Sequence, residues 1–110
     1  MAELASVNTE TFEQEVLNAS QPVLVDFTAT WCGPCKALAP ALSDMAAMYD
    51  GAVRIVKLDI DESASLAEKY GVRGVPTLML FQGGEPTLYK GMNTRSGIAA
   101  FLDKATEDAQ

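Results

Sequence analysis

Two cysteines separated by two residues are the feature of this sequence best suited to chemistry. Cys32 and Cys35 are the only cysteines in the chain, and they enclose Gly33 and Pro34. The apolar run 23–27 ends shortly before them, and apolar residues at helical spacing follow them. A Cys-X-X-Cys pair between a buried strand and a helix can cycle between a dithiol and a disulfide. The pattern therefore predicts thiol–disulfide exchange.

The two cysteines are expected to have unequal roles. Unpaired backbone N–H groups and the helix dipole favour a thiolate at a helix N-terminus, so Cys32 should be the nucleophile. Cys35 begins an apolar stripe that continues through Leu38 and Leu42. It should therefore point toward the core, while Cys32 stays exposed at the helix tip. Cys35 would then resolve the mixed disulfide, and Pro34 suits the first helical turn.

Other interpretations of the cysteine pair remain open. A structural disulfide across so short a loop gains only about 2 kcal/mol in the chain-entropy model, and the cytosol would tend to reduce it. A structural zinc site needs four ligands, whereas the chain offers two cysteines and no histidine, so only a metal shared between chains is conceivable. The lack of histidine also excludes Ser-His and Cys-His nucleophiles.

A carboxylic acid stands inside the most apolar segment of the chain. Asp26 interrupts the run 23–27, and loss of hydration there should raise the pKa of its carboxyl toward neutrality. Strand alternation places Asp26 on the same face as Leu24 and Thr28. If the following helix covers that face, Asp26 lies within water-mediated reach of Cys35 and could accept its proton. The alternative is a solvated residue at the end of a strand.

Four further residues have both a structural and a functional interpretation. Lys57 could pair with Asp26 from the neighbouring strand, although its spacing favours an ordinary surface lysine. Pro76 opens a strand behind a glycine, where a cis bond can be held, although trans proline is commoner. Trp31 either forms part of a partner-facing surface or packs at the strand–helix junction. Gly91 is either a turn residue or a position kept bare for a close backbone approach.

The surrounding pattern predicts an α/β fold in a single domain over residues 1–110. Alternating strands and helices imply parallel pairing, whereas a final hairpin forces an antiparallel edge. The expected fold is therefore a mixed five-stranded sheet with helices on both faces, in the order βαβαβαββα. Strands are expected around Val7 and over 23–27, 53–58, 77–81 and 87–89, and the last two should be joined by a hairpin loop over 82–86. Helices are expected after a Thr9 cap, after Cys32, around 66–70 and around 98–105.

Composition limits the classes of partner. Hydrophobic residues make up 48% of the chain, which is typical of a folded globular protein. The formal net charge of −7 argues against binding to nucleic acid or to anionic lipid. No apolar run approaches the roughly 18 residues of a membrane span. Residues 1–20 contain no Lys or Arg, so an export signal is not expected and the cytoplasm is the expected location.

Together these residues resemble the signatures of the thioredoxin family over nearly the whole chain. The resemblance implies the thioredoxin fold, Cys32 as the attacking thiol, Cys35 as the resolving thiol and Asp26 as a buried proton-transfer acid with Lys57 near it. It also implies a cis Pro76 facing the disulfide, so it reverses the ordinary interpretations of Lys57 and Pro76. The matching stretches are Asp26-Phe27-Thr28-Ala29-Thr30-Trp31-Cys32-Gly33-Pro34-Cys35-Lys36, Pro40, Lys57, Arg73-Gly74-Val75-Pro76-Thr77 and Gly84.

The resemblance further implies partners and a docking surface. Disulfide-containing client proteins would bind an apolar patch, with the backbone of Val75 holding the bound peptide. Thioredoxin reductase, a flavoprotein that uses NADPH, would recharge a monomer that needs no cofactor beyond the Cys32–Cys35 disulfide. Two departures stand out, because Thr28 replaces a Trp common in bacterial members and the stretch 82–91 is one residue short. The patch comprises Trp31, Gly33, Pro34, Val75, Pro76 and Gly91.

Two rival functions share the fold. Disulfide isomerases usually carry His between their cysteines, so Gly33-Pro34 favours a reductant. A non-catalytic redox-sensing or binding subunit with a thioredoxin fold is the alternative from a different class.

Overall fold

Strands and helices alternate along the chain, which ends in a hairpin and a helix. The computed structural model describes residues 4–108. The elements are β1 (Ala5–Ser6), η1 (Glu13–Leu17), β2 (Val23–Thr28), α1 (Gly33–Met48), β3 (Arg54–Asp59), α2 (Ala64–Lys69), β4 (Thr77–Gln82), β5 (Glu85–Leu88) and α3 (Arg95–Asp108).

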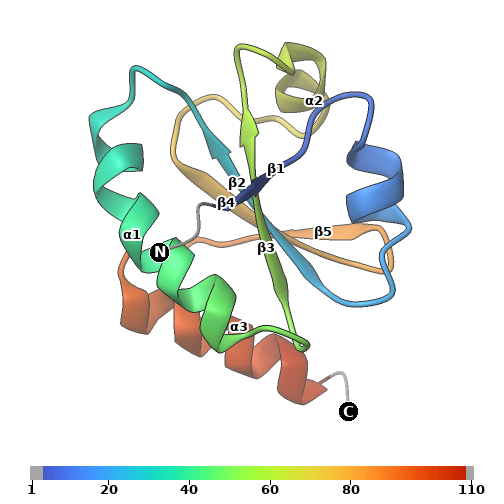
Figure 1. Cartoon of the computed structure of the whole chain (residues 1–110), viewed down its shortest axis with the longest axis vertical. Coiled ribbons are helices and arrows are strands. Elements are labelled where there is room, and N and C mark those ends of the chain that lie inside the picture. Colours follow the sequence, from blue (N-terminus) through green and yellow to red (C-terminus); the bar gives the residue numbers. More distant parts are fainter. Residues whose placement is uncertain (1–3, 109–110) are drawn as a thin grey trace.

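The five strands form one mixed sheet in the order β1-β3-β2-β4-β5 (Figure 1). Strand β3 is parallel to both β1 and β2, whereas β4 is antiparallel to β2 and β5. The crossovers from β1 to β2 and from β2 to β3 pass through helices, as parallel pairing requires. The predicted α/β fold with a mixed five-stranded sheet is confirmed.

Helices cover both faces of the sheet, and each face has its own apolar core. On one face, η1 and α2 pack over Val25 and Phe27 of β2. On the other, α1 and α3 pack over Leu24 of the same strand. Coverage on both sides explains why β2 is a nearly continuous apolar run. It also places the even-numbered side chains of β2, Asp26 among them, on the face that α1 covers.

The first helix differs from the prediction. It is a five-residue π-helix, and the Asn8 side chain, rather than the predicted Thr9, caps the turn before it. The Oδ1 of Asn8 accepts hydrogen bonds from the N–H groups of Glu10 at 2.9 Å and Thr11 at 3.1 Å. A short Asn side chain reaches backbone N–H groups two and three residues ahead, so the turn forms at Asn8 and the helix itself begins later, at Glu13. Val7 lies directly after β1 and is buried.

The hairpin loop is shorter than predicted. Gln82 pairs with Glu85, so the connection consists of Gly83 and Gly84 alone, whereas residues 82–86 were expected to form the loop. Both glycines have positive φ, 59° and 83°. A two-residue turn of this kind matches the twist of its strands, and glycine adopts it without steric strain. The predicted five-residue loop is therefore wrong.

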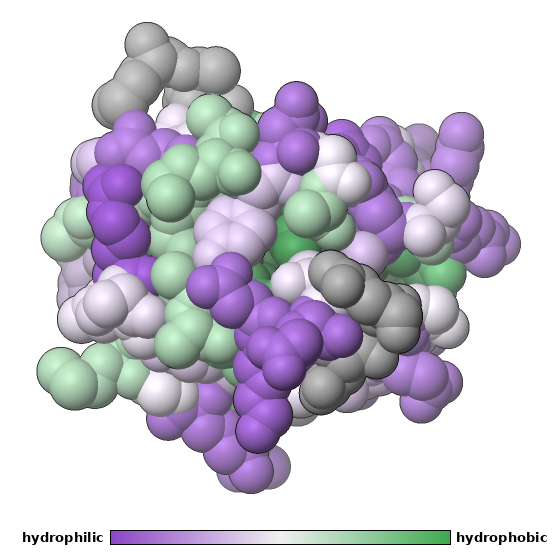
Figure 2. Space-filling view, turned by 90° about the horizontal axis from the view of Figure 1, so that it is seen from below, coloured by the Kyte–Doolittle hydropathy of each residue, from purple (hydrophilic) through white to green (hydrophobic). Residues whose placement is uncertain are grey.

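The surface is mixed in character. The side of the molecule that faces downward in Figure 1 combines hydrophilic side chains with scattered apolar ones (Figure 2). Within residues 4–108, none of the helices is both long enough and apolar enough to cross a membrane.

Candidate functional site

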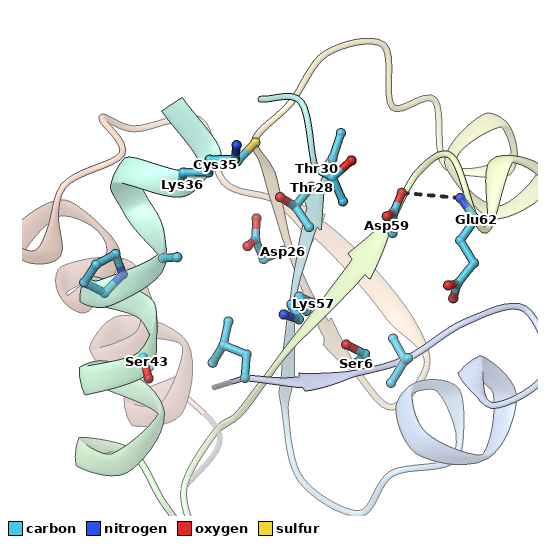
Figure 3. A pocket seen from close by; sticks show the side chains of 15 residues that line it. Ser6, Asp26, Thr28, Thr30, Cys35, Lys36, Ser43, Lys57, Asp59 and Glu62 are labelled. Carbon is cyan, nitrogen blue, oxygen red and sulfur yellow. Dashed lines mark hydrogen bonds between the residues drawn. The ribbon is translucent and has the colours of Figure 1, made fainter. Parts of the chain in front are cut away.

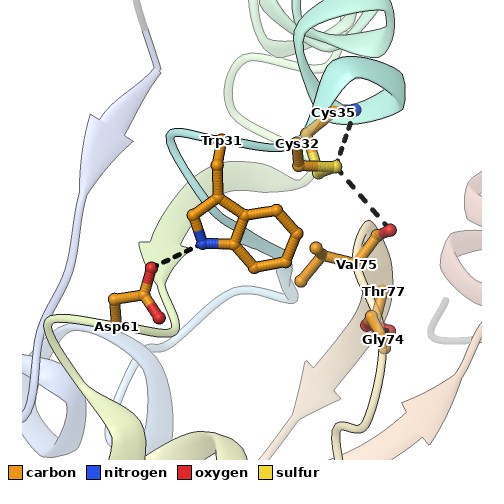
Figure 4. Close-up of a disulfide and its surroundings, with 7 residues drawn as sticks. All are labelled: Trp31, Cys32, Cys35, Asp61, Gly74, Val75 and Thr77. Atoms are coloured by element: carbon orange, nitrogen blue, oxygen red, sulfur yellow. Dashed lines mark hydrogen bonds between the residues drawn. A yellow bond between two sulfur atoms is a disulfide. The ribbon is translucent and has the colours of Figure 1, made fainter.

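Cys32 and Cys35 form a disulfide at the N-terminus of α1 (Figure 4). Their Cα atoms lie 5.3 Å apart, a separation typical of disulfides. Cys32 is the N-cap residue and has extended backbone angles, while Cys35 lies in the first helical turn. Pro34 also lies in this turn, where its missing N–H leaves no helical hydrogen bond unmade. The strand–turn–helix connection after β2 therefore brings the two sulfurs together.

The sulfur of Cys32 lies against two backbone groups. Its Sγ accepts a hydrogen bond from the N–H of Cys35 at 3.1 Å, and it lies 3.7 Å from the carbonyl oxygen of Val75 (Figure 4). In the reduced protein, the N–H of Cys35 and the positive end of the α1 dipole would both stabilise a thiolate on Cys32. The sequence-based reason for choosing Cys32 as the nucleophile therefore has a geometric counterpart.

The predicted difference in exposure between the two cysteines is wrong for the oxidised protein. Cys32 and Cys35 are each 4% exposed, and they form a small cluster with Ala29. Ile60 and Val75, from other parts of the chain, pack against this cluster. These neighbours cover the helix tip, which helical periodicity alone leaves open. The two cysteines differ in their neighbours, because Cys35 lines a cavity that Cys32 does not reach.

This cavity has a volume of about 550 Å³ and lies between α1 and the strands β1, β2 and β3 (Figure 3). Cys35, Asp26 and Lys57 all line it, and Asp26 lies between the other two in Figure 3. The parallel register pairs Asp26 on β2 with Lys57 on β3, so both side chains emerge on the same face of the sheet. Three residues predicted from separate parts of the sequence thus meet in one cavity.

Asp26 is a buried acid that titrates near neutrality. The residue is 4% exposed, and burial raises the pKa of its carboxyl from 3.8 to about 7, although the nearby charge of Lys57 acts in the opposite direction. Among the described residues, no hydrogen-bond partner reaches its Oδ1. The alternative of a solvated residue at a strand end is excluded. A group that exchanges a proton near pH 7 therefore shares a cavity with Cys35.

Trp31 lies on the surface beside the disulfide. Its side chain is 65% exposed, and the indole Nε1 donates a hydrogen bond to Oδ2 of Asp61 at 2.8 Å (Figure 4). The alternative of a simply packed aromatic residue is therefore wrong. Asp61 follows β3 and was not singled out from the sequence, because nothing in the local pattern links it to a residue 30 positions earlier.

The peptide bond between Val75 and Pro76 is cis, as the resemblance implies and contrary to the ordinary expectation for a proline. The bond directly precedes β4, and the hydroxyl of Thr77 donates a hydrogen bond to the carbonyl of Gly74 at 2.6 Å. This turn carries Val75 to the Cys32 sulfur.

Gly91 has a neighbour that the sequence did not suggest. A Cβ at Gly91 would lie 2.5 Å from the hydroxyl of Tyr89, and one at Gly97 would lie equally close to the same oxygen. The hydroxyl of Tyr89 also donates a hydrogen bond to the carbonyl of Met92. The lack of a side chain at Gly91 therefore makes room for the Tyr89 ring of the same protein.

Within the described part of the chain, residues 4–108, no group of three or more His, Cys, Asp or Glu side chains could hold a metal ion. The candidate site therefore consists of the sulfur pair and the acid–lysine pair beneath it.

Comparison with known proteins agrees with this geometry. The family model for thioredoxin matches residues 3–104. A thioredoxin of Pseudomonas aeruginosa is 50% identical over 101 residues, which cover 91% of this chain and 94% of the relative. Thioredoxin 1 of a Nostoc species is 48% identical over 105 residues, with 94% and 98% covered. A thioredoxin of Allochromatium vinosum is 46% identical over 101 residues, with 91% and 94% covered.

These relatives span nearly the same length as this chain, and the paired cysteines close into a disulfide at the N-terminus of α1. Both observations lead to the same chemistry, the reduction of protein disulfides by dithiol–disulfide exchange. The chain is a thiol–disulfide oxidoreductase and belongs to the thioredoxin family.

Proposed function

We propose that Cys32 and Cys35 reduce client disulfides in two exchange steps. In the first, the Cys32 thiolate attacks one sulfur of the client disulfide, forms a mixed disulfide and releases the other client sulfur as a thiolate. In the second, Cys35 loses its proton and attacks the Sγ of Cys32, which releases the second client thiolate. The products are a client dithiol and the Cys32–Cys35 disulfide, the form present in this structure.

Asp26 accepts the proton of Cys35 in the second step. The observation that carries this assignment is the cavity shared by Cys35 and Asp26, together with a carboxyl pKa of about 7. Near neutral pH such a group is available in both protonation states, as an acceptor of a thiol proton requires. The positive charge of Lys57 favours the carboxylate form of Asp26 and so modulates the step.

The client docks on the apolar surface around the disulfide. Trp31 is exposed there, and Val75 lies against Cys32, so the Val75 backbone is within reach of a peptide joined to that sulfur. Gly91 contributes through its backbone, because Tyr89 already occupies the space that a Cβ would fill. The docking surface comprises Trp31, Gly33, Pro34, Val75, Pro76 and Gly91.

Thioredoxin reductase then reduces the Cys32–Cys35 disulfide back to the dithiol, with NADPH as the electron source. The reductase would deliver two electrons and two protons to the Cys32–Cys35 pair, and no other cofactor takes part. The protein acts as a monomeric single domain, residues 1–110, in the cytoplasm. Membership of the thioredoxin family supports the reductase and the disulfide-containing clients as partners.

A reduction assay with insulin and dithiothreitol tests the assigned roles. Cys32→Ser and Cys35→Ser should both lose turnover, and Cys35→Ser should accumulate mixed disulfides that survive in non-reducing electrophoresis. Asp26→Asn should form the mixed disulfide at the normal rate and resolve it more slowly at pH 7. Dithiothreitol alone provides the background rate. Turnover retained by Cys32→Ser would reject the mechanism and favour a non-catalytic binding subunit.

A further inference from the structure

A second hollow lies beside the disulfide, between the first turns of α1 and the start of α3. It is a groove of about 290 Å³ lined mostly by apolar residues. Pro34 and Pro76 line it and also belong to the proposed docking surface, so the groove continues that surface away from the sulfurs. Its apolar lining residues are Pro34, Ala37, Leu38, Ala41 and Pro76, and its polar ones are Asn93 and Arg95.

Arg95 is the one charged residue among those that line the groove. Its Nη2 lies 2.7 Å from Oδ2 of Asp44 on α1, and the two side chains are 51% and 39% exposed. A guanidinium has five N–H donors in a planar fork, so a single bond to Asp44 leaves donors for a second carboxylate. Asp44 therefore holds Arg95 at the groove and leaves several of the guanidinium N–H donors of Arg95 for another acceptor.

From this placement we infer that the groove takes the extended client segment next to the reacting cysteine, and that Arg95 selects an acidic side chain on it. The inference rests on the proposed function, since it needs a client held at Cys32. Two observations support this occupant. The groove is continuous with the docking surface, and its single charge is positive in a chain whose formal net charge is −7. A client carboxylate is thus complementary to the groove.

The geometry also gives the position of the acidic residue. Asp44 follows Pro34 by ten residues on α1, which corresponds to about 15 Å along a helix. An extended peptide advances about 3.3 Å per residue, so it covers this distance in about four to five residues. The selected Glu or Asp should therefore lie about four or five residues from the client cysteine.

Asp44 competes with the client for the same guanidinium. Removing Arg95 should abolish the preference for an acidic client, whereas removing the Asp44 carboxylate should strengthen it. An ion pair that only joined α1 to α3 would behave differently, because loss of either partner would break the same bridge. Opposite effects of the two substitutions therefore distinguish selection of clients from support of the fold.

The test uses self-quenched fluorescent peptide dimers joined by one disulfide, with Glu or Gln four or five residues before or after the cysteine. The readout is the second-order rate constant for reduction by the reduced protein, expressed as the Glu/Gln ratio. We expect a ratio of about two to five for the wild type, in one of the two peptide orders. Arg95→Gln should bring this ratio to about one, and Asp44→Asn should raise it above the wild-type value.

Arg54→Gln is the matched control. Arg54 also forms a 2.7 Å ion pair, with Glu15, but it lies at the start of β3 and outside the groove. Its Glu/Gln ratio should equal that of the wild type. A wild-type ratio of one in both peptide orders would overturn the inference, as would a shift in the same direction for Arg95→Gln and Asp44→Asn. If the wild type reduces neither Glu nor Gln peptides, the proposed function itself fails.

Discussion

Asp26 and Lys57 lie side by side on the parallel strands β2 and β3, and both line the cavity that reaches Cys35. Each strand supplies one member of the pair because the register aligns their Cα positions and the alternation of the strands turns both side chains toward α1. The arrangement combines two opposing effects on one carboxyl. Burial raises the Asp26 pKa, and the positive charge of Lys57 partly offsets that rise.

Asp26→Asn should stabilise the protein at high pH and not at low pH. The folded pKa of about 7 lies above the unfolded value of 3.8. The stability associated with the protonated carboxyl is therefore fully present below pH 3.8, and it is lost progressively as the pH rises through 7. At pH 8.5 the wild type must bury a carboxylate, whereas Asn buries a neutral amide. The variant should gain at most about 4 kcal/mol there, from about three pKa units.

Urea unfolding of the oxidised proteins between pH 4 and 8.5 checks this expectation. The two stability curves should converge toward pH 4, diverge between pH 4 and 7, and run parallel above pH 7. Asp50→Asn is the control, because Asp50 is an exposed acid in the turn after α1. A constant difference between Asp26→Asn and wild type across the whole range would show that the carboxyl does not titrate near neutrality.

Lys57→Met should raise the Asp26 pKa above 7, because it removes the charge that favours the carboxylate. Resolution of the mixed disulfide needs that carboxylate, so its pH profile should shift to higher pH and its rate at pH 7 should fall. The carboxyl ¹³C shift of Asp26 measures the pKa directly, independently of turnover. Lys104→Met removes an exposed lysine from α3 and should leave the titration unchanged. An unmoved midpoint in Lys57→Met would remove the modulating role.

Asp61→Ala should release the indole of Trp31. The hydrogen bond from Nε1 to the Asp61 carboxylate fixes a ring that is otherwise 65% exposed, and an exposed charge-assisted bond contributes about 1 kcal/mol. Trp31 is the only tryptophan, so its fluorescence anisotropy reports this ring alone and should fall in the variant. The apparent KM for clients should rise while the rate of the chemical step stays similar. Unchanged anisotropy would mean that neighbouring side chains hold the ring without Asp61.

Local sequence was sufficient where a residue's environment is set by its own neighbours. Burial of Asp26 follows from the apolar run around it, and the disulfide follows from the spacing of Cys32 and Cys35. The central position of β2 follows from the same run, since apolar residues on both faces require cover on both faces. These features depend on periodicity and short-range geometry, which the sequence displays directly.

Contacts between distant segments could not be predicted in the same way. Val75 covers Cys32 from 43 positions away, which is why the predicted exposure of Cys32 is wrong. Asp61 reaches Trp31 across 30 positions, and acids near strand ends are too common to indicate such a bond. The hairpin is a different case, because Gly83-Gly84 is itself a two-residue turn signal that the longer predicted loop overlooked.

Gly91→Ala should destabilise the protein through Tyr89. The new Cβ would lie 2.5 Å from the Tyr89 hydroxyl oxygen and 2.7 Å from the ring carbon that carries it, so the ring must shift and give up its hydrogen bond to Met92. Strain and a lost hydrogen bond together should cost about 2 kcal/mol. The expected cost is smaller in a Tyr89→Ala background, where the ring is absent, so a double-mutant cycle by urea unfolding measures the contact itself. Equal costs in both backgrounds would show that Gly91 is needed for its backbone alone. Leu88→Ala is the control for the Tyr89→Ala background, because it removes another large side chain from the exposed end of β5, directly before Tyr89.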